Sequence, residues 1–285
     1  MEKTLIADSG STKTDWVVAD RAHGCSVVSA TFTSHGLNPR VLSASEIEKE
    51  MRRVSSVCGG SFDRIRFFGA GVGDQEMADI IERCLGSVFQ CDDVKAFSDM
   101  AGAAVAVLGK SPGVACIMGT GSNSCHYDGN GIDMKTASLG YLIDDNGGGV
   151  AFGRRLLRDV FKKVAPADIC EEFHRRYSLS VSDVVARIYK GAAPNRWMAE
   201  FMPFVSELRK HPYMEKMINS QLDLFFDLEF AVYPDIILKQ EGIGFAGSVA
   251  YSLSDEIASG LERRGWSLRD IVAKPMDNLK YLTII

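Results

Sequence analysis

The chain has 285 residues, of which 46% are hydrophobic and 24% are charged, and its formal net charge is −5. This composition is typical of a globular protein with an ample core, and the length suggests two domains. The negative charge disfavours a nucleic-acid partner. No run of residues approaches the ~20 apolar positions of a membrane span, and the N-terminus has no apolar stretch long enough for a signal peptide. We therefore expect a cytoplasmic protein with no membrane partner.

The cysteine pattern argues against a metal cluster. The chain has seven cysteines, an odd number, and no two of them form a C-x-x-C pair. Neither the cysteines nor the five histidines cluster at the spacing of metal ligands. We expect structural thiols in a reducing compartment.

The first half of the chain predicts the element order βββαβα. Strands are expected near residues 4–8, 14–20, 26–32, 65–68 and 94–97. Ser45 and Glu48 form a candidate capping box for a helix that runs to about Val57. Residues 75–85 have apolar side chains at helical spacing, and an Ala-rich helix is expected over residues 98–108.

The second half opens in the same way, with two strands around a glycine turn. Strands are expected near residues 113–118, 123–127, 135–139, 243–247 and 267–273. A long and mostly helical stretch is expected from about 149 to 230, and a further helix over 248–264.

The repetition is architectural, because each half begins with a β-hairpin. We therefore predict an α/β protein with two domains, residues 1–108 and residues 109–285. The second domain contains the helical insertion, and the last helix of the chain is a candidate to pack back on the first domain.

The two hairpin turns carry groups that nucleotide phosphates prefer. In the first turn Asp8 supplies a carboxylate for Mg²⁺, and the residues that follow supply N–H and O–H donors and a cation. The candidates for phosphate binding are Gly10, Ser11, Thr12 and Lys13 in the first turn and Gly119, Thr120 and Gly121 in the second. Either turn alone is most simply a plain hairpin. Two together, each near a carboxylate, favour the two walls of one nucleotide cleft.

Two better-known phosphate motifs do not apply. No Gly-Lys-Ser/Thr follows a glycine at the spacing of a Walker P-loop. Residues 242–247 match G-x-G-x-x-G, but no acidic ribose ligand lies at the expected distance and no Rossmann unit surrounds them. A dinucleotide site there is disfavoured.

Three further segments are candidates for chemistry. Asp99 follows a strand and begins a helix, so either Ser98 or Asp99 is expected to be the helix N-cap. Asp99 is also a candidate base at the active edge of the sheet, and the two roles are compatible. The loop with Asp145 and Asn146 offers polar side chains to sugar hydroxyls, and an Asx-rich turn is an equal alternative. Gly247 and Ser248 join a strand to a helix, where they could admit an adenine ring or simply allow tight packing.

These segments occur in the order of a known family. The motifs are residues 8–14, 98–103, 119–123, 145–148 and 247–250. Together they resemble the N-acetylglucosamine kinase / BadF-BadG-BcrA-BcrD ATPase family of the actin–hexokinase–Hsp70 superfamily, over essentially the whole chain. Two positions depart from the family pattern: Ser9 stands where a second Gly is common, and Asn146 where sugar kinases commonly have Glu.

The resemblance implies two ribonuclease-H-like, actin-like ATPase domains with a nucleotide cleft between them, and a homodimer. By position, Asp8 resembles the carboxylate that organises Mg²⁺, and Asp99 resembles the catalytic base. The two glycine turns resemble the ATP phosphate loops, and Gly247 with Ser248 resembles the adenosine motif. The positions that resemble sugar-binding residues are Asn38, Asn123 and Asp145.

The leading hypothesis is an ATP-dependent kinase for an amino sugar, with the 6-hydroxyl of N-acetylglucosamine as acceptor. The first alternative is an ATPase of the BadF type that drives a partner enzyme, which the cysteine spacing disfavours. The second is a regulator that binds a nucleotide or a sugar without turnover, which the loss of the Glu at Asn146 keeps open.

Overall fold

The computed structural model describes residues 2–10, 13–22, 25–59 and 61–281. The chain divides into two compact units. Unit 1 comprises Met1–Lys110 and Lys274–Ile285, and unit 2 comprises Ser111–Ala273. In the described part of the chain, no helix is both long and apolar enough to cross a membrane.

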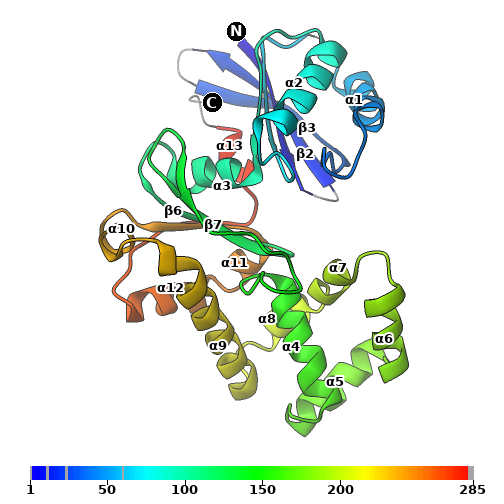
Figure 1. Cartoon of the computed structure of the whole chain (residues 1–285), viewed down its shortest axis with the longest axis vertical. Coiled ribbons are helices and arrows are strands. Elements are labelled where there is room, and N and C mark those ends of the chain that lie inside the picture. The colour runs from blue at the N-terminus through cyan, green and yellow to red at the C-terminus, as the bar shows by residue number, and fades with distance from the viewer. Residues whose placement is uncertain (1, 11–12, 23–24, 60, 282–285) are drawn as a thin grey trace. The chain divides into compact units, whose positions relative to one another are not determined.

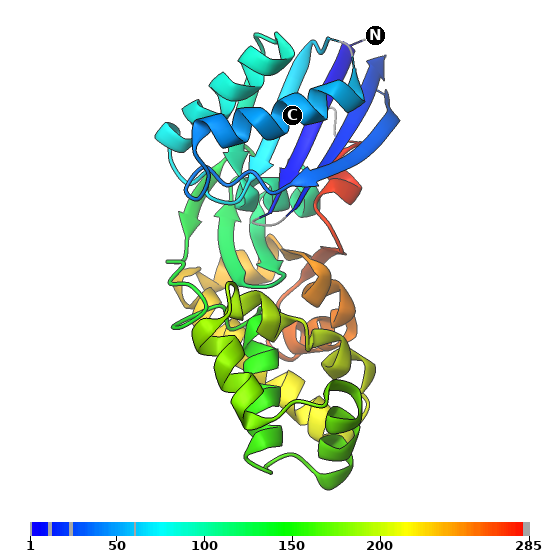
Figure 2. The same ribbon diagram turned by 90° about the vertical axis from the view of Figure 1, so that its right-hand side faces the viewer.

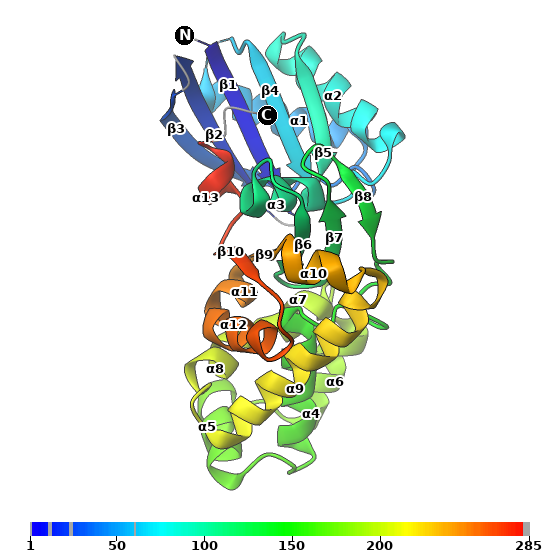
Figure 3. The ribbon, with the colours of Figure 1, turned by 90° about the vertical axis from the view of Figure 1, so that its left-hand side faces the viewer.

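Unit 1 is built on a five-stranded mixed sheet in the order β3-β2-β1-β4-β5 (Figure 3). Its strands are β1 (Glu2–Ser9), β2 (Lys13–Ala22), β3 (Cys25–His35), β4 (Arg64–Gly69) and β5 (Val94–Ser98). β1, β2 and β3 pair antiparallel, whereas β1, β4 and β5 pair parallel. The carboxyl ends of β1, β4 and β5 therefore lie at one edge of the sheet.

Helices cover both faces of this sheet. They are α1 (Ala44–Cys58), α2 (Gln75–Phe89), α3 (Asp99–Leu108) and α13 (Met276–Leu279). Phe67 of β4 belongs to the core with α1 and α2, which cross one face in Figure 2. Its neighbour Phe68 points to the other face, where Gly102 of α3 packs against its ring. α13 packs on α3 and β1, which joins the C-terminal segment to unit 1.

Unit 2 repeats the same sheet topology, with the order β10-β9-β6-β7-β8. Its strands are β6 (Gly113–Met118), β7 (Ser122–Tyr127), β8 (Ile132–Lys135), β9 (Ile243–Ala246) and β10 (Leu268–Val272). The first three pair antiparallel and β6, β9 and β10 pair parallel. The two units are thus versions of one architecture, as the two hairpins predict.

The helices of unit 2 form a larger apolar core with this sheet. They are α4 (Gly149–Phe161), α5 (Ala167–Tyr177), α6 (Val181–Lys190), α7 (Pro194–Ala199), α8 (Met202–Glu207), α9 (Pro212–Glu229), the 3-10 turn η1 (Phe230–Val232), α10 (Asp235–Gln240), α11 (Ser248–Ser252) and α12 (Ser254–Arg263). α4 contacts α5, α7, α8 and α9 (Figure 1). Phe173, Phe204, Phe225 and Phe245 are completely buried in this core.

The structure corrects two predicted elements at the ends of α1 and β8. α1 begins at Ala44, and its capping box is Ser43 with Glu46 instead of Ser45 with Glu48. Both pairs have the right spacing, but the backbone is extended at Ser43, where the helix starts. β8 ends at Lys135, where the prediction has it begin. Asp128 accepts hydrogen bonds from the N–H groups of Asn130 and Gly131, and this tight turn starts β8 early.

The predicted stretch 149–230 is mostly helical, as expected, and consists of six separate helices, α4 to α9. The predicted helix 248–264 is interrupted at Leu253, whose φ of −115° and ψ of 27° end α11 before α12 begins. The Leu253 side chain is completely buried in the core even though the helix is interrupted at this residue.

Candidate functional site

Acidic side chains gather at the carboxyl edge of the unit 1 sheet. Asp8 lies at the end of β1 and pairs with Asp15 of β2 in the strand register. Burial, together with the nearby carboxylates of Asp15 and Asp99, raises the pKa of Asp8 from 3.8 to about 7, and the Lys274 ammonium opposes this rise. This edge therefore concentrates negative charge that a cation would stabilise.

The turn after β1 is closed by hydrogen bonds on both sides. The Gly10 N–H donates to the Lys13 carbonyl over 2.9 Å. The Ser9 hydroxyl accepts from the Leu37 N–H over 3.0 Å and lies 2.8 Å from the Thr14 hydroxyl. Ser9 thus ties the turn to the loop that carries Asn38. Ser11 and Thr12, two of the predicted phosphate-binding residues, lie outside the described residues. The Lys13 ammonium is half-exposed and pairs with Asp15.

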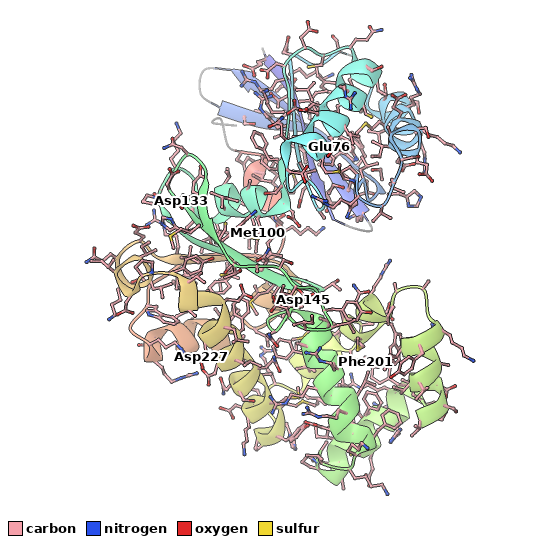
Figure 4. The ribbon with its side chains drawn as sticks, viewed as in Figure 1. Glu76, Met100, Asp133, Asp145, Phe201 and Asp227 are labelled. Carbon is pink, nitrogen blue, oxygen red and sulfur yellow. The ribbon has the colours of Figure 1, made fainter. Side chains whose placement is uncertain are left out.

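Asp99 is the first residue of α3, but it is not the cap. The Ser98 hydroxyl accepts from the Ala101 N–H over 3.2 Å and caps the helix. One Asp99 oxygen, Oδ1, accepts from the N–H of Met100, the residue labelled in Figure 4, over 2.9 Å. Burial raises the pKa of Asp99. Ser98 therefore provides the capping bond, and Asp99 Oδ1 is bonded to the Met100 N–H and not to the Ala101 N–H.

Asn38 is held in a fixed position in unit 1. Its Oδ1 atom accepts from the Arg40 N–H over 2.9 Å. It lies against Gly71, whose φ is +86°, and a Cβ added at Gly71 would lie 2.0 Å from Asn38 Oδ1. Gly71 is a residue that the sequence analysis misses, because its contact with Asn38 depends on the tertiary fold.

The glycine turn of unit 2 is joined to the start of α4. The N–H groups of Gly149 and Val150 donate to the carbonyls of Gly119 and Thr120 over 2.8 and 3.0 Å. A Cβ added at Gly121 would lie 2.5 Å from Asp145 Oδ1. The turn and the Asp145 loop therefore approach each other as closely as glycine allows.

Asp145 is fixed by the same turn. Its Oδ1 atom accepts from the Ser122 N–H over 2.8 Å, and the Ser122 hydroxyl accepts from the Gly147 N–H over 2.9 Å. Burial raises the pKa of Asp145 and the Ser122 N–H opposes that rise. Figure 4 places Asp145 in the loop just before α4. The neighbouring Asn146 is buried, and its carbonyl accepts from the Gln221 side chain over 2.9 Å.

Asn123 lies on β7, beside a group of hydroxyls. Its Oδ1 atom accepts from the Ser124 N–H over 2.9 Å and from the Thr136 hydroxyl over 3.1 Å. Thr136 also contacts Glu229, a buried carboxylate at the end of α9. Glu229 could not be predicted from the sequence, since nothing in the pattern of α9 indicates which of its acidic residues is buried.

A cavity of about 490 Å³ lies in unit 2 next to the glycine turn. Gly119 and Thr120 line it, as does Ser248 at the start of α11. Gly247 lies behind it with φ +128°, where an added Cβ would be 2.2 Å from the Met118 carbonyl. Most of the remaining wall comes from the helical insertion, including Arg196, Glu200 and Ser206, and the rest comes from α11. This volume is in the range of small-molecule sites.

The unit 1 edge also suits a magnesium ion that is bound mainly through water and phosphate. Among the described residues, no group of three or more His, Cys, Asp or Glu side chains is arranged to hold a metal. Mg²⁺ commonly keeps several waters and takes only one or two carboxylates. Asp8 meets that requirement, because its carboxylate is partly buried among other negative charges.

No family model and no curated protein matches the chain. The structure named "Putative N-acetylglucosamine Kinase" from Porphyromonas gingivalis is 33% identical, with a TM-score of 0.89 and 97% of each chain covered. A second structure of that name, from Chromobacterium violaceum, is 14% identical, with a TM-score of 0.74 and 98% of each chain covered. A ROK family glucokinase from Streptomyces griseus, in complex with glucose and AMPPNP, shares the fold at 15% identity and a TM-score of 0.58, with 98% of this chain and 97% of its own covered.

The fold is therefore that of the actin-like ATPases and sugar kinases, with two ribonuclease-H-like units, which confirms the predicted fold class. Within that class, the chain belongs to the N-acetylglucosamine kinase family. Members of this class of enzyme are phosphotransferases with a hydroxyl group as acceptor.

Proposed function

We propose that the chain transfers the γ-phosphoryl group of ATP to a hydroxyl of an amino sugar, with the 6-hydroxyl of N-acetylglucosamine as the leading acceptor. The observation that carries the proposal is Asp99, a partly buried carboxylate at the start of α3, where Ser98 and not Asp99 caps the helix. A general base is most effective when its pKa lies near the working pH, and burial moves the pKa of Asp99 in that direction.

In this proposal each predicted residue has one role. Asp99 accepts the proton of the sugar hydroxyl as its oxygen attacks the γ-phosphorus. The described backbone of Gly10 and of Gly119 to Gly121, with the Lys13 ammonium, stabilises the charge of the phosphates. Ser11 and Thr12 are assigned the same role from the sequence alone.

Asp8 is the carboxylate that would hold Mg²⁺, which when bound neutralises phosphate charge.

The cavity of unit 2 is the proposed site of the adenosine. It adjoins Gly119 and Thr120, so a nucleoside there would have its phosphates next to the glycine turn. Ser248 lines it, and Gly247 allows the backbone to approach Met118 closely. Asn38, Asn123 and Asp145 are the proposed sugar contacts, and each already has one side-chain oxygen committed to a backbone N–H.

The test is ADP formation by the purified protein with ATP, Mg²⁺ and a panel of amino sugars and hexoses, against a control without sugar. We expect N-acetylglucosamine to stimulate ADP formation and a phosphorylated sugar to appear by mass spectrometry. Stimulation by a different sugar would correct the substrate and retain the chemistry. Equal ADP with and without every sugar would contradict the proposal. The homodimer that the resemblance implies is part of the same proposal, and sedimentation velocity tests it.

A further inference from the structure

Glu229 is a buried carboxylate that the proposed chemistry does not use. It is the last residue of α9 and is 4% exposed. Its Oε2 atom accepts from the Thr136 hydroxyl over 2.7 Å and from the Ser124 hydroxyl over 2.9 Å. Among the described residues, no cationic side chain forms an ion pair with it. A buried charge without a cation is costly, so a role other than stability is indicated.

The two hydroxyls connect Glu229 to different neighbours. The Thr136 hydroxyl lies 3.1 Å from Asn123 Oδ1, on the side of the proposed sugar contact. The Ser124 hydroxyl lies 2.9 Å from the Tyr233 hydroxyl, on the side of the core. An ionised carboxylate only accepts hydrogen bonds, so both hydroxyls donate to Glu229. The Thr136 hydroxyl has one proton, which Glu229 Oε2 at 2.7 Å and Asn123 Oδ1 at 3.1 Å share in a three-centre hydrogen bond. Ser124 then accepts from Tyr233.

This arrangement fixes the orientation of the Asn123 amide. The Oδ1 atom of Asn123 accepts from the Ser124 N–H and lies next to the Thr136 hydroxyl, which Glu229 holds in place. The Nδ2 group is then the part of the amide that remains to donate to a ligand. Burial raises the pKa of Glu229, the hydrogen bonds from the Thr136 and Ser124 hydroxyls oppose that rise, and the charges of Asp144 and Asp145 add to it.

We propose that Glu229 is a positioning residue for the acceptor substrate: it holds Thr136, and Thr136 holds Asn123 with its amide NH₂ group free to bind an acceptor oxygen of the sugar. This inference rests on the proposed function, because Asn123 has a ligand to bind only if a sugar occupies the site. The inference extends the proposed function by one contact: the Asn123 NH₂ group donates a hydrogen bond to an oxygen of the sugar.

Steady-state kinetics with sugar and with ATP as the varied substrate test the assignment. Thr136→Val removes the hydroxyl and keeps the shape, and we expect the KM for the sugar to rise about tenfold. Glu229→Gln keeps the shape and removes the charge, and we expect a rise of about three- to tenfold. In both variants the KM for ATP is expected to change less than about twofold, because neither residue lines the adenosine cavity.

The matched control is Tyr233→Phe, which removes a hydrogen bond from the same cluster on the side away from Asn123. We expect it to lower the thermal midpoint and leave the KM for the sugar unchanged. The double variant of Thr136→Val with Glu229→Gln is expected to match Thr136→Val alone, because Glu229 acts through Thr136. If Glu229→Gln does not fold, the sugar KM of Thr136→Val compared with that of Tyr233→Phe still tests whether the cluster positions Asn123.

Three outcomes count against the assignment. A sugar KM that is unchanged in both Thr136→Val and Glu229→Gln, with an active wild type, would overturn it and leave the proposed function intact. An equal rise in Tyr233→Phe would show a merely structural effect. A wild type whose ADP formation responds to no sugar would remove the proposed function, and the assignment with it.

Discussion

Replacing Gly71 with Ala tests whether the position of Asn38 matters for the sugar. Gly71 has φ +86°, and a methyl group there would lie 2.0 Å from Asn38 Oδ1. The left-handed backbone costs an L-residue about 1–2 kcal/mol. The Asn38 side chain must also rotate and give up its bond from the Arg40 N–H, which contributes about 0.5–1.5 kcal/mol. The sum is about 1.5–3.5 kcal/mol of unfolding free energy.

Two measurements follow from this estimate. The thermal midpoint is expected to fall by about 3–14 °C, because 1 kcal/mol shifts it by about 2–4 °C in chains of about 150–250 residues. The KM for the sugar is expected to rise by about tenfold or more, because the displaced Asn38 no longer presents its amide correctly.

Gly109→Ala is the matched control in the same unit. Gly109 has φ +66°, and nothing lies within 4 Å of an added methyl group. This variant is therefore strained but leaves Asn38 in place, so its thermal midpoint should fall and its sugar KM should not change. An unchanged sugar KM in Gly71→Ala, or an equal rise in Gly109→Ala, would refute the reasoning.

Three further predictions concern Asp99 and two pH-dependent groups. Asp99→Asn should lower the rate of phosphorylation about 10²- to 10⁴-fold with a similar KM for ATP, measured by ADP release; near-normal activity would exclude Asp99 as the base. The pKa of His126 is raised, against the effect of burial, by two hydrogen-bonded carboxylates, so its contribution to stability is complete below about pH 6.5 and is lost as the pH rises through its folded pKa. Urea unfolding should show that the free energy of unfolding falls more between pH 6 and pH 9 in wild type than in His126→Gln. An equal fall in the two proteins would contradict this prediction. Hydrogen bonds from two arginines lower the pKa of Asp93 from 3.8 to about 2, so its contribution is present above pH 3.8 and is lost as the pH falls toward 2. In Asp93→Asn, the free energy of unfolding from urea titrations should therefore fall less than in wild type as the pH drops below 3.8. An equal fall in both proteins would contradict this prediction.

Local pattern is sufficient to predict the strands and turns that form the edge of each sheet. Asp8 is the next-to-last residue of β1, Asp99 directly follows β5 and Gly119 directly follows β6, so each lies at the carboxyl end of a strand, as the apolar runs before them predict. The ends of elements are harder to predict. Ser43 and Ser45 offer equivalent capping boxes, and only the path of the chain into α1 selects Ser43.

The parts of the site that depend on distant contacts could not be predicted. Gly71 is required by Asn38, which lies far from it in the sequence. Glu229 is separated from Ser124 by 105 residues, and its burial depends on how α9 packs against β7. The wall of the cavity in unit 2 that contains Glu200 comes from an insertion whose helices carry no motif.

The effect of having Asn146 where sugar kinases commonly have Glu could not be predicted from the sequence alone. Its carbonyl binds Gln221, and its side-chain amide lies 3.4 Å from an Asp144 oxygen, so Asn146 packs into the unit. Asp145 keeps its bond from the Ser122 N–H at this loop. The loop therefore retains one ordered carboxylate where sugar kinases commonly have two acidic residues.

The most direct test of the central claim is the ratio of phosphorylated sugar to ADP when the purified protein turns over ATP with excess N-acetylglucosamine. The account predicts one phosphorylated sugar for each ADP, with both products reduced together in Asp99→Asn. ADP that forms without any phosphorylated sugar would contradict the account and indicate an ATPase that is uncoupled or driven by a partner.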